Sequence, residues 1–279
     1  MTNHYIDLKN SDCIMVCGAN SAETSPVSWR WINEAQENGT KVIVVDPRFT
    51  RTASRADIFA QIRAGTDSAF FSGLVNYALE NDMVQTEYVK NYTNAPFLIN
   101  PDFEFDTATG LFSGFDEDAK KYSTKSWGYQ TGDDGKPLTD PELKDPNCVF
   151  QLIKEHFSRY TPEVVSEVTG ISKDTFLEIA KTFCATGAPE KSGVLFYSVG
   201  ITQHSHSSQI IRAFDVLQLL LGNIGVAGGG INAMAGASNG MAGALNAMVW
   251  HALPTSMSAP NSKKTPTLDS YVEPKLKTA

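Results

Sequence analysis

The stretch VIVVDPRFTRTASRADIFAQIRAGTD, residues 42–67, joins a β-branched run to two polar triplets, DPR and GTD. Residues 42–45 have the continuous apolar composition of a parallel strand that is buried on both faces. Pro47 has no N–H to donate to a sheet, so it ends the strand. Residues 50–62 are expected to continue as a helix, or as a helix and a short strand. Thr66 or Asp67 is then the N-cap of a long amphipathic helix.

The same alternation of strand and helix continues on both sides of this stretch. The apolar runs DCIMVCGAN (12–20) and SGVLFYSVG (192–200) predict two more buried strands. Helices are predicted over residues 25–39, 65–83, 148–160, 161–170, 172–187 and 207–225. This alternation favours an α/β fold built on a doubly wound, mostly parallel sheet.

Two segments break the alternation and set the predicted domain boundaries. Residues 1–230 are expected to form one α/β domain, with a surface insertion at about 95–147 that is rich in Asp, Gly, Pro and aromatic residues. Because eight Phe, Tyr and Trp side chains of the insertion need apolar neighbours, we expect it to be ordered. Residues 231–279 are expected to be a glycine-rich segment and the incomplete start of a neighbouring domain, with disorder in the polar tail.

The composition argues against several classes of partner. The chain has 279 residues and a net charge of −8, which disfavours nucleic acid and anionic membranes as ligands because both require a basic surface. No apolar run approaches the roughly 18 residues that span a bilayer, so direct membrane insertion is not expected. The start MTNHYIDLKNSD carries no export signal, and the sequence leaves the cellular location open.

Four cysteines stand at positions 13, 17, 148 and 184. Cys13 and Cys17 occupy positions i and i+4 of a predicted strand, about 13 Å apart, which is too far for a disulfide. Their spacing also differs from that of zinc or iron–sulfur ligands. The apolar neighbours predict that both are buried thiols.

Four loops follow predicted strands or begin predicted helices. They cover residues 17–26, 46–50, 65–67 and 199–206. In an open parallel sheet, ligands bind outside the carboxyl ends of the strands. The first loop has Gly18 for a tight turn and small polar residues, Asn20, Ser21 and Thr24, at a helix entry, where backbone N–H groups favour phosphate and other anions. It has neither a GxGxxG nor a GxxxxGK[ST] pattern, and an ordinary helix-capping loop is an equal alternative.

The second and third loops carry carboxylates. Asp46 and Arg48 are placed to contact a ribose or the edge of a base, as acidic residues do in dinucleotide folds. The alternative is a surface salt bridge of Asp46 with Arg51 or Arg55. Asp67 is alternatively a helix cap and nothing more. What favours a binding site is the conjunction of these side chains at one edge of one sheet.

The fourth loop, VGITQHSH, places Gln203, His204 and His206 just after a buried strand. Histidine is the usual acid–base residue near neutral pH. However, no carboxylate or cysteine lies near these residues in the sequence to complete a catalytic triad. A metal site at the two histidines would need further ligands, which the spacing does not supply. A packed or hydrogen-bonded histidine is therefore the favoured interpretation.

Several longer sequence segments resemble the large (alpha) subunit of molybdenum- or tungsten-dependent formate dehydrogenases. The resemblance is to the periplasmic or membrane-associated type, within the molybdopterin oxidoreductase family. These segments, which occur in the same order as in the family, are MTNHYIDLKNSD, GANSAE, VVDPRFTRTASRAD, AGTDSAF, SRYTPE, GITQHS, LLLGNIGVAGGGINA and LPTSMSAPN. The resemblance implies two-electron oxidation of formate to CO2 at a metal held by two molybdopterin guanine dinucleotides. It also implies that this chain's own task is to bind the dinucleotide.

The same resemblance assigns cofactor contacts to particular loop residues. Asp46 is implied as a partner for ribose or guanine, and Asp67 as a partner for the amino edge of guanine. Gln203 and the backbone at Val199 and Gly200 resemble residues near the pterin. The full implied set is Gly18, Ala19, Asn20, Ser21, Glu23, Thr24, Asp46, Pro47, Arg48, Thr50, Gly65, Thr66, Asp67, Val199, Gly200, Gln203 and His204.

The chain also departs from the family's pattern. AGASNGMAG (235–243) stands where the family has Arg-Gly-x-x-Asn-Val-Gln-Gly, so Ala235 replaces the arginine that holds the formate carboxylate, and Met241 lies near the place of the glutamine. The family's iron–sulfur cysteines, and the selenocysteine or cysteine that ligates the metal, precede the matched region, and a C-terminal domain follows it. We therefore expect an internal portion with no catalytic residue, no metal or iron–sulfur ligand and no activity alone.

The expected partners are the N- and C-terminal portions of the same subunit and an iron–sulfur electron-transfer subunit. A reading frame begun after a selenocysteine UGA codon would explain the start at Met1. Two other functions stay open. One is a non-catalytic module that binds pterin dinucleotide, and the other is a nicotinamide-dependent oxidoreductase on a Rossmann-like domain. The choice between molybdenum and tungsten is open as well.

Overall fold

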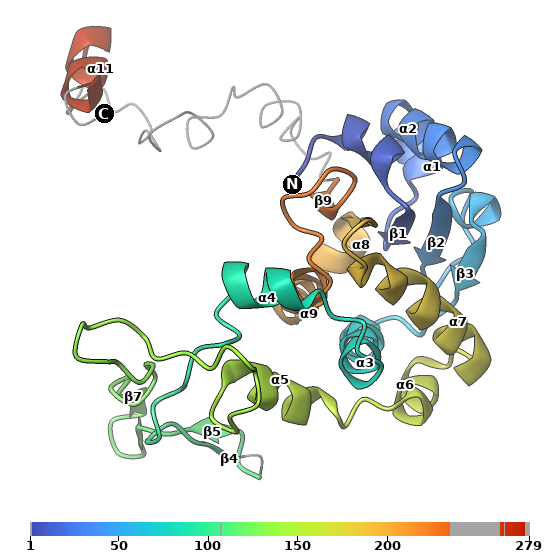
Figure 1. Ribbon diagram of the computed structural model, residues 1–279. Helices are drawn as coiled ribbons and strands as arrows, with labels where there is room; N and C mark the ends of the chain where they lie inside the picture. The colour runs from blue at the N-terminus through green and yellow to red at the C-terminus, as the bar shows by residue number, and fades with distance from the viewer. Residues whose placement is uncertain (1, 107, 235–262, 265, 277–279) are drawn as a thin grey trace. The chain divides into compact units, whose positions relative to one another are not determined.

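The computed structural model describes residues 2–106, 108–234, 263–264 and 266–276 (Figure 1). By its internal contacts the chain divides into two compact units, residues 1–232 and 233–279. Helix α11 (Leu268–Leu276) belongs to the second unit, so the expectation of disorder is wrong for that part of the tail. Ala235 and Met241, which the sequence singled out, lie outside the described residues.

A five-stranded sheet forms the centre of the first unit. Its strands are β1 (Cys13–Cys17), β2 (Lys41–Val45), β3 (Ile58–Ala60), β8 (Gly193–Tyr197) and β9 (Gly230–Ala233), in the order β3-β2-β1-β8-β9. β1 pairs in parallel with both β2 and β8, and β2 pairs in parallel with β3. All residues of β1 and β8 are buried, as continuous apolar runs in a covered parallel sheet require. The predicted α/β fold with a mostly parallel sheet is confirmed.

The order of the strands creates a reversal next to β1. The chain moves outward from β1 to β2 and β3, and then crosses back to place β8 on the other side of β1. Because such crossovers are right-handed, the helices of the two directions cover opposite faces. α2 (Pro26–Glu37) contacts β2, whereas α7 (Lys173–Cys184) contacts β1 and β3, and Figure 1 shows the strands between them. Loops after β1 and β8 diverge at this reversal, where ligands bind in open α/β sheets.

The remaining helices pack around this sheet. They are α1 (Ser21–Thr24), α3 (Asp67–Glu80), α4 (Thr86–Tyr92), α5 (Val149–Phe157), α6 (Pro162–Thr169), α8 (Val199–Thr202) and α9 (Ser207–Leu220), with short 3-10 turns η1 (Tyr5–Asn10), η2 (Ala53–Arg55) and η3 (Ala185–Gly187). α3 and α9 pack against each other through fully buried aromatic rings, and the centroids of Phe71 and Phe214 lie 4.2 Å apart. This aromatic layer fixes where the N-terminus of α3 meets the edge of the sheet.

Local signals account for most of the element ends. Thr161 and Ser172 cap α6 and α7 as predicted, because their side-chain oxygens accept from the N–H groups of Val164 and Thr175. Residues 50–62 contain a 3-10 turn and strand β3, which is closest to the second of the two interpretations, with a 3-10 turn in place of the helix. The segment after β8, expected to be a loop, begins with the one-turn helix α8.

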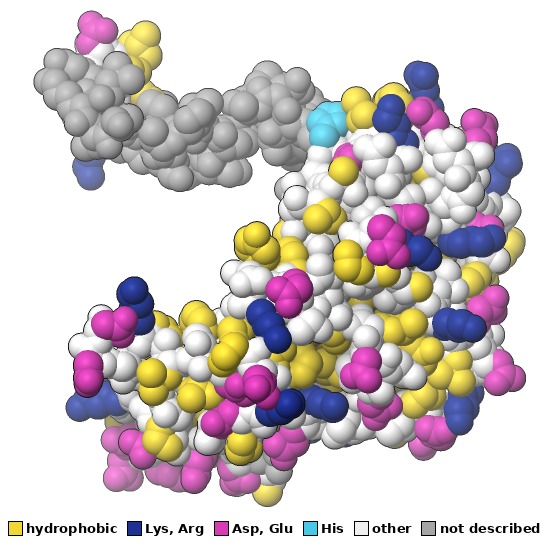
Figure 2. All heavy atoms as spheres, viewed as in Figure 1, with side chains coloured by type: hydrophobic (Ala, Val, Ile, Leu, Met, Phe, Trp, Pro, Cys, Tyr) yellow, Lys and Arg dark blue, Asp and Glu magenta, His cyan; other side chains and the backbone are white. Residues whose placement is uncertain are grey.

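The insertion is ordered, as predicted. Two small hairpins, β4 (Phe105–Asp106) with β5 (Leu111–Phe112) and β6 (Phe115–Asp116) with β7 (Lys121–Tyr122), carry four of its eight aromatic residues. All eight rings contact another ring, namely those of Phe97, Phe103, Phe105, Phe112, Phe115, Tyr122, Trp127 and Tyr129. Figure 2 shows acidic side chains gathered over this part of the surface. The aromatic cluster therefore stabilises a segment that has little regular secondary structure.

The four cysteines are all buried and unbonded, so the prediction of buried thiols is confirmed for Cys13 and Cys17. Burial raises the pKa of the Cys13 and Cys184 thiols far above the ordinary range, which keeps both neutral. Within the described residues, no helix is both long and apolar enough to cross a membrane.

Candidate functional site

A pocket of about 220 Å³ opens at the carboxyl edge of the sheet, beside the reversal at β1. Three strand-end loops and the start of α3 form its walls. It is lined by Gly18, Ala19, Asn20, Asp46, Pro47, Arg48, Thr50, Ala64, Asp67, Gly200 and His204. Ten of these are residues that the sequence assigned to one site, and Ala64 is the addition. The structure therefore brings loops that are far apart in the chain around one small cavity.

The floor of the pocket is built from backbone. The N–H of Gly18 donates to the carbonyl of Val45 at 3.1 Å, and the N–H of Gly200 donates to the carbonyl of Gly18 at 3.1 Å. Gly18 has a φ of +52°, a conformation that glycine adopts without strain. A Cβ on Gly200 would lie 2.4 Å from the Gly18 oxygen, so only glycine allows the two loops to approach this closely. The ends of β1, β2 and β8 are thereby locked together.

Asp46 shapes the loop after β2. Its N–H donates to the carbonyl of Ala60 at 3.1 Å, which extends the pairing with β3 by one residue. Its Oδ1 accepts from the N–H of Arg48 at 2.8 Å and closes a tight turn, a common role for aspartate. The alternative of a salt bridge from Asp46 to Arg51 or Arg55 is wrong for the described residues, since Arg51 instead lies 3.7 Å from Glu23.

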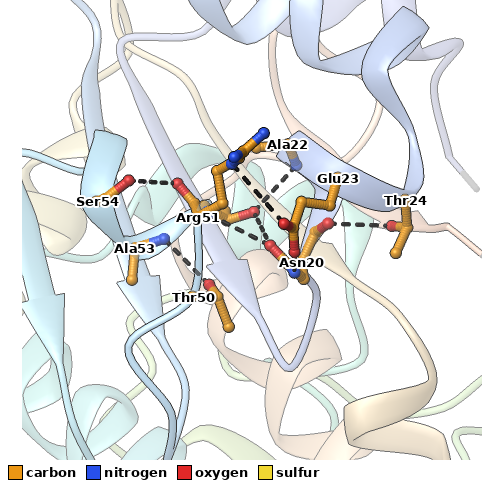
Figure 3. A network of polar contacts seen from close by, with 9 residues as sticks. Asn20, Ala22, Glu23, Thr24, Thr50, Arg51, Ala53 and Ser54 are labelled. Atoms are coloured by element: carbon orange, nitrogen blue, oxygen red, sulfur yellow. Dashed lines mark hydrogen bonds and ion pairs between the residues drawn. The ribbon is translucent and has the colours of Figure 1, made fainter.

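A network of side chains joins the loop after β1 to the loop after β2 (Figure 3). The Oγ1 of Thr52 donates to Asn20 Oδ1 at 3.0 Å and accepts from the N–H of Ala22 at 3.0 Å. Asn20 also donates to the carboxylate of Glu23, and Thr24 donates to the Asn20 carbonyl at 3.2 Å. The polar groups of Asn20 and Thr24 therefore stabilise the loop itself.

Asp67 and His204 face each other across the pocket. His204 Nε2 lies 3.9 Å from Asp67 Oδ2, and the side chains are 22% and 9% exposed. Burial raises the pKa of the Asp67 carboxyl above its ordinary value; its own backbone N–H, His204 and His206 act against this rise, and Asp46 adds to it. The sequence placed no carboxylate near His204, because the two residues are neighbours only through the fold.

The remaining predicted residues lie beside the pocket but do not line it. They are Ser21, Glu23, Thr24, Gly65, Thr66, Val199 and Gln203. Thr66 precedes α3, yet its hydroxyl donates to the Arg63 carbonyl at 2.7 Å and leaves the N-terminus of the helix uncapped by a side chain. Sequence reasoning missed Thr52, which is fully buried between the loops. In the sequence, Thr52 is one of several small polar residues in the segment that follows DPR, and nothing there indicates that it is buried.

Comparison with known proteins assigns this architecture to a family. The family model for molybdopterin oxidoreductase matches residues 1–271. The chain belongs to the molybdopterin oxidoreductase family. The resemblance to this family that the sequence showed is thereby confirmed.

The chain is also similar to formate dehydrogenase subunits. It is 46% identical over 274 residues to the nitrate-inducible formate dehydrogenase major subunit of Escherichia coli, which covers 98% of this chain and 27% of that protein. It is 45% identical over 254 residues to formate dehydrogenase 2 subunit alpha (cytochrome c-553) of Nitratidesulfovibrio vulgaris, covering 91% of this chain and 25% of that protein. The chain thus spans about a quarter of the length of these relatives.

A solved structure supports the fold. Acetylene hydratase from Pelobacter acetylenicus superposes with a TM-score of 0.51 over 78% of this chain and 24% of its own chain, at 21% sequence identity. At that identity the likeness concerns the fold alone. The shared feature is the mostly parallel sheet flanked by helices.

Proposed function

We propose that this chain is the guanine-dinucleotide-binding portion of a formate dehydrogenase catalytic subunit, and that the pocket at the edge of the sheet holds the guanosine end of a molybdopterin cofactor. The observation that carries the proposal is that two carboxylates, Asp46 and Asp67, line one pocket whose floor is the bare backbone of Gly18 and Gly200. The similarity to formate dehydrogenase subunits supports the choice of cofactor and of substrate.

The residues present fit one end of such a cofactor. The two glycines let the loops after β1 and β8 meet without side chains between them, so the pocket wall at this point is backbone that a ribose or phosphate can approach closely. The Arg48 side chain lines the same wall and supplies a cation that suits phosphate. An ionised Asp67 accepts hydrogen bonds, and guanine presents N–H donors on its edge. A pocket of about 220 Å³ accommodates part of a dinucleotide, and the rest of the ligand would extend beyond it.

The cofactor, when bound in the intact enzyme, would supply a molybdenum or tungsten centre for the two-electron oxidation of formate to CO2. This chain's residues bind and orient the nucleotide end and keep the sheet edge closed against water. Among the described residues no group of three or more His, Cys, Asp and Glu side chains is placed to hold a metal ion. We propose that the isolated chain binds nucleotide and does not oxidise formate, because it spans only about a quarter of the length of its formate dehydrogenase relatives.

The proposed partners are the remaining portions of the same catalytic subunit and an iron–sulfur subunit that carries electrons away. The relatives named above are about four times longer than the matched region, so a family subunit has ample chain to complete the site. The iron–sulfur cluster of the family and the ligand to the metal are assigned to those portions.

The proposal is tested by titrating the purified chain with GMP and GDP in a calorimeter, with AMP as the control nucleotide. Guanine nucleotides are expected to bind and AMP to bind at least about tenfold more weakly, because adenine presents an acceptor where guanine presents a donor. Absence of guanine-nucleotide binding would refute the proposal. Enhancement of NADH fluorescence instead would favour the nicotinamide-dependent alternative.

A second candidate is a module that binds pterin dinucleotide and never catalyses. The observation that favours it is Ala235, which stands where the family has an arginine for the formate carboxylate. A formate–dye assay on the chain combined with its missing portions separates the two functions. Metal-dependent turnover supports the enzyme portion, whereas bound guanine dinucleotide without turnover supports the module.

A further inference from the structure

The pair formed by Asp67 and His204 has a geometry suited to a ligand. Asp67 is the first residue of α3, and His204 follows α8, so two rigid elements hold the pair in place. The 3.9 Å between His204 Nε2 and Asp67 Oδ2 is within ion-pair range but longer than a hydrogen bond. The imidazole therefore influences the charge of the carboxylate without occupying its lone pairs. Both side chains line the same pocket.

The charged groups around Asp67 act in opposite directions. His204 and His206, from the segment after α8, favour the ionised carboxylate, whereas Asp46, from the loop after β2, opposes it. Arg48 lines the same pocket, and the buried thiol of Cys17 at the end of β1 has its pKa raised by burial and by the charges of Asp67 and Asp46. Desolvation disfavours the ionised form most strongly, and the backbone N–H of Asp67, followed by His204 and His206, acts against it.

We propose that His204 is a positioning residue that keeps the Asp67 carboxylate ionised and directed into the pocket, so that it accepts two hydrogen bonds from the N1–H and amino groups of guanine. This inference rests on the proposed function of the pocket. A protonated carboxyl has an O–H on one oxygen and cannot accept from both donors. Guanine binding therefore weakens as the pH falls and Asp67 takes up a proton. A charged His204 extends binding to lower pH.

Nucleotide titrations of the full chain between pH 5 and pH 8.5 test the inference. The probes are GMP and IMP, which lacks the amino group. The variants are His204→Ala and His204→Gln, with His156→Ala on α5 as a matched control outside the pocket. At pH 5.5 both His204 variants are expected to bind GMP at least about threefold more weakly than the wild type, and this ratio is expected to be smaller at pH 8, whereas His156→Ala is expected to follow the wild type at every pH. The loss is expected to be smaller for IMP.

Carboxyl NMR of chain labelled with [13C]aspartate gives a readout without a ligand. The Asp67 signal, assigned with an Asp67→Asn sample, is expected to titrate at higher pH in both His204 variants than in the wild type and in His156→Ala. Unchanged Asp67 titration, or GMP binding by the variants that follows the wild type at every pH, overturns the role of His204 alone. If the wild type binds neither GMP nor IMP, the proposed function fails and this inference falls with it.

Discussion

The backbones of Gly18 and Gly200 are in direct contact, with the N–H of Gly200 donating to the carbonyl of Gly18 at 3.1 Å. They follow β1 and β8, the two strands that flank the reversal of the sheet. A Cβ at either position would lie within 2.8 Å of the backbone of the other glycine, so a side chain would push the two loops apart. Both glycines also line the pocket. The contact is therefore a requirement both for the sheet edge and for the cavity that it encloses.

Replacing Gly200 tests this requirement. The added Cβ of Gly200→Ala would lie 2.4 Å from the Gly18 oxygen, so one of the two loops must move. We expect a loss of about 1–3 kcal/mol in the free energy of unfolding, as for other overpacked sites. Affinity for GMP is expected to fall as well, since the floor of the pocket is displaced. Urea denaturation and calorimetric titration measure the two effects.

Gly128→Ala is the matched control for this substitution. No atom lies within 4 Å of a Cβ at Gly128, and its φ is not positive. Its stability is expected to stay within about 0.5 kcal/mol of the wild type. Wild-type stability and GMP affinity in Gly200→Ala would show that the two loops tolerate a side chain.

The sequence predicted the sheet and the meeting of the loops, for a physical reason. Uninterrupted apolar runs such as residues 42–45 suit only a covered parallel strand, and loops after parallel strands share one edge. That rule alone places Asp46 and Asp67 beside one pocket, as the structure has them. The short strand β3 was left ambiguous because three residues are too few to show a period.

Contacts that depend on packing could not be predicted. His204 had no carboxylate nearby in the sequence, and only the docking of α3 on α9 brings Asp67 within 3.9 Å of it. Thr52 was not recognised because a threonine in a polar segment gives no signal of burial. The tie between Asn20 and Thr52 exists only once both loops are in place.

Thr52→Val removes the hydroxyl's part of that tie while keeping the shape of the side chain, and the bond from the Thr52 N–H to Asn20 Oδ1 at 3.3 Å remains. Without the hydroxyl, Asn20 Oδ1 loses a donor and the N–H of Ala22 loses an acceptor. Unpaired polar groups cost about 1–3 kcal/mol, so we expect destabilisation in that range. Thr182→Val, whose hydroxyl only donates to the Glu178 carbonyl of its own helix, is the control and is expected to change stability by at most about 0.5 kcal/mol. Equal effects of the two variants in urea denaturation would contradict a bridging role for Thr52.

At Gly73 in α3, helix propensity and packing predict opposite effects of an alanine substitution on stability. Alanine in a helix interior is favoured over glycine by about 1 kcal/mol. A Cβ at Gly73, however, would lie 2.4 Å from Val165 Cγ2 on α6 and 2.9 Å from the ring of Phe176 on α7. We expect packing to dominate and Gly73→Ala to be destabilised by about 1–3 kcal/mol, measured as the midpoint shift in urea.

A double variant distinguishes a steric cause from any other. Val165→Ala removes the methyl group that the new Cβ would meet, so Gly73→Ala is expected to cost less in that background than in the wild type. The coupling energy from the double-mutant cycle is expected to be favourable by about 1 kcal/mol. Strict additivity of the two substitutions would mean that the contact between α3 and α6 is not what limits position 73.

Asp67→Asn is expected to stabilise the chain near neutral pH. Because the pKa of Asp67 is raised in the folded chain, protonation favours folding; this contribution is complete below the ordinary value of 3.8 and is lost as the pH rises through the raised folded value. The variant has no such ionisation. Its advantage in free energy of unfolding is therefore expected at pH 7 and expected to shrink as the pH falls towards 4. GMP affinity is expected to be lost in the same variant.

Asp57→Asn is expected to follow the opposite pH dependence. Burial acts upward on the pKa of Asp57, but bonds from the N–H of Val42 at 2.9 Å and from Lys41 at 3.2 Å outweigh it and lower the pKa. A lowered pKa contributes stability that is present above 3.8 and lost as the pH falls through the folded value. The variant is therefore expected to be less stable than the wild type at pH 7 and to approach it in acid. Parallel pH trends for the two variants in urea unfolding between pH 3 and pH 8 would contradict the assignment of opposite charge environments to Asp67 and Asp57.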